Sequence, residues 1–194
     1  MDEIKLELIS GEDIEQCREL CNELMAFQKL KATISKESFD GMNFDTRMKK
    51  SYEGAIRSHV IVAKDGDTPI GYVFSAIDEE NEGSRNYFPD WAPMKGVEGV
   101  KGFYPDWVKF PQKIGCLNNL YIKEAYRNKG LGKKMLDIAM EWLESFEDVD
   151  LIFVYISNGN DAALDFYLKH GFTFSHNVFG EFIKAAYKIK AQVK

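Results

Sequence analysis

Residues 126–134 read YRNKGLGKK, and they follow the apolar run Leu117, Leu120 and Ile122. The segment sets two glycines among cationic side chains at the point where a strand pattern ends and a helical pattern begins. Bare backbone beside positive charge is typical of an anion site, usually a phosphate bound by main-chain N–H groups at the first turn of a helix. The sequence therefore predicts a strand, a phosphate-binding turn and a helix, in this order.

The composition narrows the class of protein. A chain of 194 residues with ordinary apolar and charged fractions suits about one globular domain, which we place over residues 1–194. The formal net charge of −6 argues against a nucleic-acid partner, because phosphate backbones are bound by clusters of Lys and Arg. The odd number of cysteines, 3, suits reduced thiols better than a disulfide frame or a metal site, and we expect Cys17 and Cys21 to pack in a core.

The hydropathy pattern bears on the cellular location of the protein. No apolar run approaches the roughly 20 residues of a membrane span. The start of the chain, MDEIKLELISGEDIE, alternates charged and apolar residues, unlike a secretory signal. We therefore expect a cytoplasmic protein without a membrane partner. The sequence is compatible with a monomer or a homodimer.

Periodicity predicts a mixed α/β arrangement. Alternation marks strands, apolar residues at helical spacing mark helices, and Asp65-Gly66-Asp67 is the turn signal of an antiparallel hairpin. Strands that alternate with helices in the second half indicate crossover connections. The expected elements are a strand at 3–9, helices at about 12–28 and 36–57, strands at 59–65, 69–78 and 113–122, a helix at 130–147, a strand at 150–157, a helix at 161–169, and two strands around 177–180.

The stretch 79–112 lacks such a pattern and is rich in glycine, proline and aromatic residues. It is too long for an ordinary connection, so we expect a functional loop or an inserted subdomain. Within it, YFPDW at 87–91 is echoed by FYPDW at 103–107. Two Pro-Asp turns pinned by aromatic side chains explain the echo better than a substrate-facing aromatic wall.

Residues 126–134 do not match two well-known phosphate-binding motifs. A P-loop requires Ser or Thr after its Gly-Lys pair, whereas Lys134 follows Gly132 and Lys133. A dinucleotide fingerprint requires a third glycine where Met135 stands. Taken alone, the segment is also compatible with a glycine-rich turn and a solvated basic helix start.

Three motifs, in order, resemble the GCN5-related N-acetyltransferase (GNAT) superfamily. The segment Arg127-Asn128-Lys129-Gly130-Leu131-Gly132 resembles its R/Q-x-x-G-x-G/A motif, and LNNLYIKEAY before it is similar to the family's fourth strand. NGNDAALDFYLKHGF resembles its N-x-x-A-x-x-x-Y-x-x-x-G-F region. The resemblance covers about residues 113–176 and implies an α/β (α+β) fold. The expected sheet is mixed and mostly antiparallel, has about seven strands and about four flanking helices, and is splayed between the fourth and fifth strands.

The resemblance also implies acetyl-coenzyme A (acetyl-CoA) as cosubstrate, without a metal. Its diphosphate needs several donors at once, which the N–H groups from Asn128 to Lys133 would supply, and its pantetheine arm would pair with the main chain of the fourth strand. Arg127 would shape the loop or bind phosphate, and Asn160 would orient the arm or cap a helix. The expected cofactor-binding residues are Leu120, Tyr121, Ile122, Arg127, Asn128, Lys129, Gly130, Leu131, Gly132, Lys133 and Asn160.

The expected catalytic residue is Tyr167, which occupies the family's position for the acid that assists the leaving thiolate. The general base is not evident, because Asn118 and Asn119 stand where many relatives carry Glu or Asp. A water chain to a more distant carboxylate is one substitute, and a histidine is a weaker one. The carboxylates are Asp78, Glu79 and Glu181, and the histidines are His59 and His176.

These observations predict an N-acetyltransferase in which a primary amine attacks acetyl-CoA directly. Cys116, a thiol near the site, leaves a covalent route open. The acceptor is either a small-molecule amine or a peptide or protein amine. Loop residues could line a site for a cationic amine or form a private aromatic cluster: Phe88, Trp91, Phe103, Tyr104 and Trp107, with Glu79, Glu80, Glu82, Asp90 and Asp106. A non-catalytic acyl-CoA sensor and an unrelated nucleotide-binding domain are the alternatives.

Overall fold

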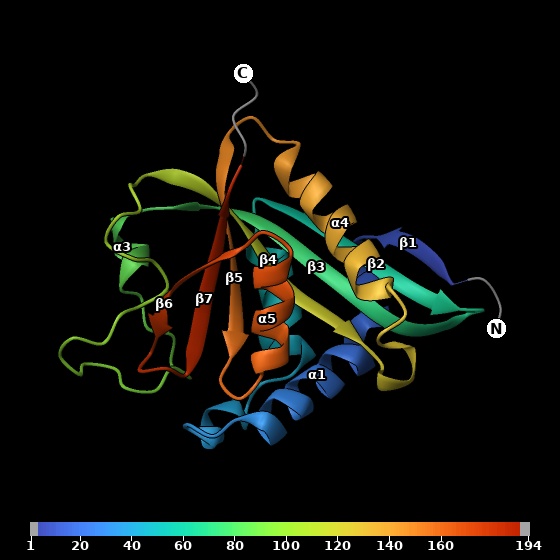
Figure 1. The fold of residues 1–194 in the computed structure, drawn as a ribbon, viewed down its shortest axis with the longest axis horizontal. Coiled ribbons are helices and arrows are strands. Elements are labelled where there is room, and N and C mark those ends of the chain that lie inside the picture. Colours follow the sequence, from blue (N-terminus) through green and yellow to red (C-terminus); the bar gives the residue numbers. More distant parts are fainter. Residues whose placement is uncertain (1–3, 191–194) are drawn as a thin grey trace.

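Seven strands form one mixed sheet in the computed structural model of the chain, which describes residues 4–190 (Figure 1). Their spatial order is β1-β2-β3-β4-β5-β7-β6, and neighbouring strands are antiparallel except β4 and β5, which run parallel. The predicted fold class is therefore confirmed. The strands are β1 (Lys5–Ile9), β2 (Arg57–Asp65), β3 (Thr68–Glu80), β4 (Gln112–Ile122), β5 (Val149–Ser157), β6 (Thr173–Val178) and β7 (Ile183–Ile189).

Helices cover both faces of the sheet. Adjacent residues of β3 point to opposite faces, so Val73 packs with Met135 of α4 while Phe74 packs with Leu24 of α1. In Figure 1, α4 and α5 lie in front of the sheet. The helices are α1 (Arg18–Lys31), α2 (Lys50–Gly54), α3 (Glu82–Arg85), α4 (Leu131–Glu144) and α5 (Asp161–Lys169), with the short helices η1 (Gly11–Cys17), η2 (Lys36–Phe39), η3 (Phe44–Lys49) and η4 (Glu124–Tyr126).

The parallel strands β4 and β5 separate part-way along their length. Their pairing ends where Leu117 lies opposite Val154, although β4 continues to Ile122 and β5 continues to Ser157. The last residues of β4 therefore have no strand partner on the β5 side. This opening is the splay that the sequence predicts.

A bulge in β4 lies at the same point. On the β3 side, Phe74 pairs with Asn119 and Ser75 pairs with Leu117, so Asn118 is an extra residue outside the ladder. An extra residue bends a strand and increases its local twist. The bulge therefore turns the end of β4 away from β5 and widens the opening.

The helical boundaries differ from the predictions in the first third of the chain. The helix predicted from residue 12 begins as the 3-10 helix η1, and α1 extends beyond residue 28 to Lys31. The helical region predicted over 36–57 is divided into η2, η3 and α2. Ser35 has a left-handed φ of 46° and Asn43 is extended with φ −153°, and both conformations interrupt a helix.

The irregular loop is shorter than the predicted 79–112. Strand β3 runs to Glu80, α3 follows, and β4 begins at Gln112, so residues 86–111 remain irregular. The strand predicted at 3–9 is β1, and its predicted first residue, Glu3, lies outside the described residues.

Aromatic side chains hold the loop to the sheet. Each predicted Pro-Asp turn is closed by a main-chain hydrogen bond. Ala92 N donates to Pro89 O at 2.9 Å, and Val108 N donates to Pro105 O at 3.1 Å. Trp91 and Phe103 then pack edge-on against Phe179, with ring centroids 5.7 and 5.0 Å away. The two pinned turns are confirmed, and Trp91 and Phe103 also line a cavity.

Candidate active site

The turn between β4 and α4 leaves its main-chain N–H groups free. None of these groups from Asn128 to Lys133 has an acceptor within residues 4–190, and the first helical hydrogen bond joins Lys134 N to Gly130 O at 3.1 Å. Asn128 and Gly130 have left-handed φ values of 60° and 81°, which aim successive N–H groups to one side. The turn can therefore donate several hydrogen bonds to one anion.

Gly132 is not explained by protein contacts. A Cβ atom built there would lie 3.6 Å from Ile122 and 3.9 Å from Phe166, which are ordinary contact distances. Its backbone is helical, at the second position of α4. Neither the backbone conformation nor the neighbouring atoms require glycine at this position. The absence of a side chain is therefore consistent with space for a ligand.

The cationic side chains of the turn bind protein groups. Arg127 Nε donates to Ile122 O at 2.8 Å, and Lys129 Nζ donates to Ala125 O at 2.8 Å. Lys133 forms an ion pair with Asp137 one turn along α4. The Arg127 hydrogen bond is compatible with the role of shaping the loop, and the main-chain N–H groups are free donors for an anion.

The predicted pantetheine edge lies on the open side of β4. Leu120, Tyr121 and Ile122 pair with β3 through one edge and have no β5 partner on the other. The Ile122 carbonyl already accepts the Arg127 hydrogen bond, so it is partly engaged. The Tyr121 side chain points to the α1 face, where its hydroxyl donates to Glu23 at 3.1 Å.

A cavity of about 760 Å³ lies on the α1 face beside the opening of the sheet. This volume is in the range of small-molecule sites. Its walls come from α1, the short helices after it, the aromatic loop and strands β3, β4 and β5. The lining residues include Arg47, Asp78, Glu80, Trp91, Phe103, Tyr104, Cys116, Asn118, Asn119, Tyr155 and Ser157.

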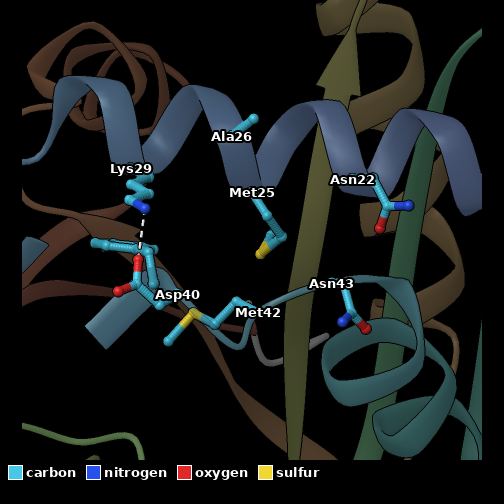
Figure 2. A pocket seen from close by; sticks show the side chains of 8 residues that line it. Asn22, Met25, Ala26, Lys29, Asp40, Met42 and Asn43 are labelled. Carbon is cyan, nitrogen blue, oxygen red and sulfur yellow. Dashed lines mark ion pairs between the residues drawn. The ribbon is translucent and has the colours of Figure 1, made fainter. Parts of the chain in front are cut away.

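A second cavity, of about 220 Å³, lies under α1 (Figure 2). Met25, Phe39 and Met42 line both cavities, so the two adjoin. An ion pair between Lys29 and Asp40 spans its rim. Thioether side chains adapt to different shapes, so this wall can adjust to a ligand in the larger cavity.

Two residues that line the larger cavity carry a buried polar atom without a partner among the described residues. These atoms are Asn118 Oδ1, at the bulge of β4, and Ser157 Oγ, at the end of β5. Both lie where the parallel strands separate. Buried polar groups are normally hydrogen-bonded, so an acceptor and a hydroxyl left free at this opening suit a polar ligand there.

Two carboxylates lie on the β3 wall of this cavity. Asp78 and Glu80 alternate with Glu79 along the strand, and only these two line the cavity. Burial, with a contribution from the nearby Glu80, raises the pKa of Asp78 above its ordinary value of 3.8. Glu80 accepts a hydrogen bond from the hydroxyl of Tyr104 at 3.1 Å.

The other general-base candidates lie elsewhere. Glu181 contacts Asn177 through a hydrogen bond of 3.3 Å. His59 stacks on Trp142, with ring centroids 5.0 Å apart, and His176 Nε2 contacts the carbonyl of Gly102. None of these three side chains lines the cavity, so Asp78 is the candidate that the geometry retains.

Cys116 lines the cavity but is a poor nucleophile. Its pKa is raised by burial, and the carboxylates of Asp78 and Glu80 raise it further. The thiolate is the reactive form of cysteine, so the thiol remains unreactive at neutral pH. The geometry therefore disfavours a covalent route through this residue.

Tyr167 lies on α5 and is 6% exposed. No hydrogen bond joins its hydroxyl to another residue within the described range, and burial followed by the nearby Cys116 raises its pKa. The phenol therefore keeps its proton at neutral pH. Asn160 occupies the N-cap position of the same helix, and its side chain makes no capping hydrogen bond.

The predicted aromatic and acidic residues divide into two groups. Trp91, Phe103, Tyr104, Glu80 and Asp90 line the cavity, in agreement with a site there. The others lie outside it: Phe88 packs on Phe179, Trp107 packs on Tyr187, Glu82 pairs with Arg85, Asp106 pairs with Lys101, and Glu79 is exposed.

The sequence interpretation missed two residues. Arg47 lines the cavity from η3, and its irregular helical surroundings gave no signal. Asn158 is buried, and its Oδ1 accepts the N–H groups of Thr33 and Ile34 at 2.7 and 2.9 Å. Its position beside Asn160 in the β5–α5 turn was the available clue. It fixes the segment after α1 to the end of β5.

The comparisons with known proteins agree with this geometry. The profile of the acetyltransferase (GNAT) family matches residues 24–172, which is more than half of the chain. The chain therefore belongs to the acetyltransferase (GNAT) family. No curated protein matches the chain.

Several solved structures share the fold at low identity. PaiA N-acetyltransferase from Thermoplasma acidophilum, in complex with coenzyme A, has a TM-score of 0.61 and 16% identity, covering 96% of this chain and 99% of that one. The NatC complex bound to Gag peptide and CoA gives 0.58 and 17%, covering 97% and 99%. Arabidopsis thaliana NAA60 with a bisubstrate analogue gives 0.55 and 14%, covering 96% and 97%.

The described helices and side chains bear on membranes and metals. Across residues 4–190, no helix is both long enough and apolar enough to cross a bilayer. The same residues contain no group of three or more His, Cys, Asp or Glu side chains arranged to hold a metal ion.

Proposed function

We propose that the protein is an N-acetyltransferase that moves an acetyl group from acetyl-CoA to a primary amine by direct attack. The observation that carries the proposal is the free main-chain turn at Asn128–Lys133 beside an open β4 edge that leads to the cavity. The turn would hold the diphosphate, the edge would pair with the pantetheine arm, and the cavity would hold the acceptor. Membership of the acetyltransferase (GNAT) family supports this assignment.

Each polar group at the opening has a role in this proposal. When bound, acetyl-CoA supplies a thioester carbon that an amine can attack with loss of a thiolate. Asp78, whose raised pKa makes it a better base than an exposed carboxylate, accepts the proton of the amine directly or through water. Asn118 Oδ1 can accept an N–H of the amine or of the pantetheine arm, and Ser157 Oγ can donate to a carbonyl oxygen.

Tyr167 assists the leaving group through a hydrogen bond. A phenol with a raised pKa is a weaker acid than a free thiol, whose pKa is about 8.5, so complete proton transfer to the thiolate is unfavourable. Donation of the O–H to the sulfur still stabilises the developing negative charge. The direct route is favoured because the Cys116 thiol stays protonated.

The acceptor has the chemistry of a small amine or a peptide amine. The cavity of about 760 Å³ suits either a small molecule or the end of a peptide. Two of the structures with the same fold contain a peptide or a bisubstrate analogue, so peptide amines belong among the acceptors to test.

Thiol release tests the proposal. Acetyl-CoA is incubated with the protein and a panel of primary amines, and free thiol and acetylated product are measured together. We expect stoichiometric thiol and product with at least one amine class. Tight binding of acetyl-CoA in calorimetry without turnover would instead support an acyl-CoA sensor. Tighter binding of ATP or NAD than of coenzyme A would support a nucleotide-binding domain.

A further inference from the structure

Arg47 presents an unpaired guanidinium to the cavity. The other arginines, Arg18, Arg57, Arg85 and Arg127, each donate to a carboxylate or a main-chain carbonyl. No hydrogen bond or ion pair joins the Arg47 side chain to a protein group between residues 4 and 190. Its Cζ lies 4.6 Å from the centre of the Trp91 ring. The planar group therefore stacks on an aromatic side chain with its N–H donors unused.

The surroundings of Arg47 supply no anionic partner within the described residues. The side chain is partly exposed to the cavity, and desolvation lowers its pKa. Cys21, Cys116 and Tyr72 interact with it, and burial raises the pKa of each of these three groups, so they are neutral at physiological pH. A partly desolvated cation without a charged partner attracts an anion.

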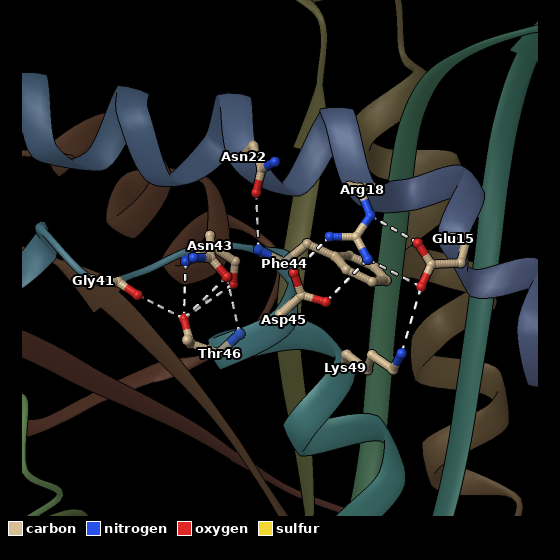
Figure 3. A network of polar contacts seen from close by, with 9 residues as sticks. All are labelled: Glu15, Arg18, Asn22, Gly41, Asn43, Phe44, Asp45, Thr46 and Lys49. Carbon is tan, nitrogen blue, oxygen red and sulfur yellow. Dashed lines mark hydrogen bonds and ion pairs between the residues drawn. The ribbon is translucent and has the colours of Figure 1, made fainter.

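The helix that carries Arg47 is fixed on both sides (Figure 3). Asn43 and Thr46 form a reciprocal capping box, and Asn22 of α1 accepts the Phe44 N–H at 2.9 Å. Asp45 accepts hydrogen bonds of 2.6 and 3.0 Å from Arg18, and Arg18 also binds Glu15. These contacts hold η3 against α1. The guanidinium is therefore preorganised, which reduces the entropy lost on binding.

The cavity is lined by charges of both signs: Arg47, Lys50, Asp45, Asp78, Glu80 and Asp90. Asp45 is already paired with Arg18. Arg47 approaches from η3, whereas Asp78 and Glu80 line the β3 wall. No ion pair joins Arg47 to either carboxylate within the described residues, and the pKa of Asp78 responds to burial and to Glu80. An acceptor with a cationic end and an anionic end matches both walls at once.

Resting on the acetyl transfer proposed above, we propose that the acceptor is an amine that also carries a carboxylate. The guanidinium of Arg47 binds this carboxylate with paired N–H donors, which is the geometry that arginine offers and lysine lacks. Trp91 supports the planar group from behind. The amine then faces Asp78 and the opening of the sheet. Arg47 thus determines specificity by binding the end of the acceptor that does not react.

Matched acceptors test this inference. Amino acids and their carboxamides are compared as acceptors for the wild-type protein and for Arg47→Gln, Arg47→Lys and Lys49→Gln. Lys49 is the control, since it lies two residues away on the same helix and pairs with Glu15. Loss of a charged hydrogen bond contributes about 1.5–3 kcal/mol, so Arg47→Gln should raise KM for the acids about 10- to 100-fold and leave KM for the amides unchanged. Arg47→Lys should restore only part of the affinity.

Other results would overturn the inference. Equal KM values for acids and amides in the wild-type protein, or an equal loss of kcat with both in Arg47→Gln, would show that Arg47 does not recognise a carboxylate. Calorimetric titration with N-acetyl amino acids and their amides, in the presence of coenzyme A, measures the same contact without turnover. A failure of thiol release with every amine would therefore reject the proposed acetyl transfer, while the titration would still decide the role of Arg47.

Discussion

The two sides of the sheet opening are built in different ways. On the side proposed for the cosubstrate, consecutive residues of one turn leave main-chain N–H groups free, while Arg127 and Lys129 bind protein groups. On the acceptor side, side chains from α1, η3, β3, β4, β5 and the aromatic loop meet around one cavity. A main-chain site recognises a group common to all reactions of a family, whereas a side-chain site can be changed one residue at a time.

The largest effect is expected from a substitution of Asp78, on the side proposed for the acceptor. Without this base, Asp78→Asn should lower kcat/KM by on the order of 10²–10⁴. The wild-type rate should fall as the pH decreases through the raised pKa of Asp78, and the variant should lack this decline. Glu79→Gln is the matched control, since Glu79 is the exposed neighbour on the same strand. Equal activity of Asp78→Asn and the wild type would remove Asp78 from the mechanism.

The same variant also separates catalysis from stability. The folded-state pKa of Asp78 is raised above 3.8, so the folded protein binds this proton more tightly than the unfolded chain. Stability therefore falls as the pH rises from the ordinary value through the raised one. Asp78→Asn should thus unfold at a higher temperature than the wild type at neutral pH in a calorimetric scan. A lower unfolding temperature would indicate a structural role instead.

The next largest effect is expected from a substitution of Gly132, on the side proposed for the cosubstrate. An Asp side chain fits beside its neighbours and suits the first turn of a helix, where acidic groups stabilise by about 0.3–1 kcal/mol. It would also repel a diphosphate. Gly132→Asp should therefore keep or raise the unfolding temperature and weaken coenzyme A binding by roughly 100-fold, about 2.7 kcal/mol. Gly132→Ala, the smallest addition at the same position, should weaken binding less than Gly132→Asp does, because it adds no charge.

A smaller effect is expected at Tyr167. Its hydroxyl contributes no hydrogen bond to another described residue, so Tyr167→Phe should leave the unfolding temperature unchanged. Loss of a hydrogen bond to a charged group should lower kcat about 10- to 100-fold with little change in the KM for acetyl-CoA. A change in that KM without a change in kcat would assign Tyr167 to binding.

The smallest effect is expected at Cys116. With its thiol protonated, it cannot carry the acetyl group efficiently, so Cys116→Ser should retain kcat within about 3-fold, less than 1 kcal/mol of the barrier. Mass spectrometry of the wild-type protein mixed with acetyl-CoA should detect no acetylated cysteine. Loss of turnover in the variant together with an acetylated wild type would establish the covalent route.

The sequence predicts the main-chain turn better than it predicts the cavity. The turn at 126–134 could be interpreted because its chemistry depends on glycines and N–H groups at fixed spacing, which local sequence displays. The strands were found by alternation, and the splay came from the family resemblance. Arg47 could not be found, because its role depends on tertiary packing against Trp91, far along the chain. Asp78 was one candidate among several until the strand register placed it, and not Glu79, in the cavity.

The main-chain turn at Asn128–Lys133 can be tested atom by atom. Amide resonances of labelled protein are followed during titration with coenzyme A and, separately, with pantetheine, which lacks the diphosphate. Binding of a diphosphate should shift these amides strongly and slow their hydrogen exchange with coenzyme A only, because each N–H then gains an acceptor. Equal responses to both compounds, or shifts confined to other parts of the chain, would contradict the diphosphate site on which the account rests.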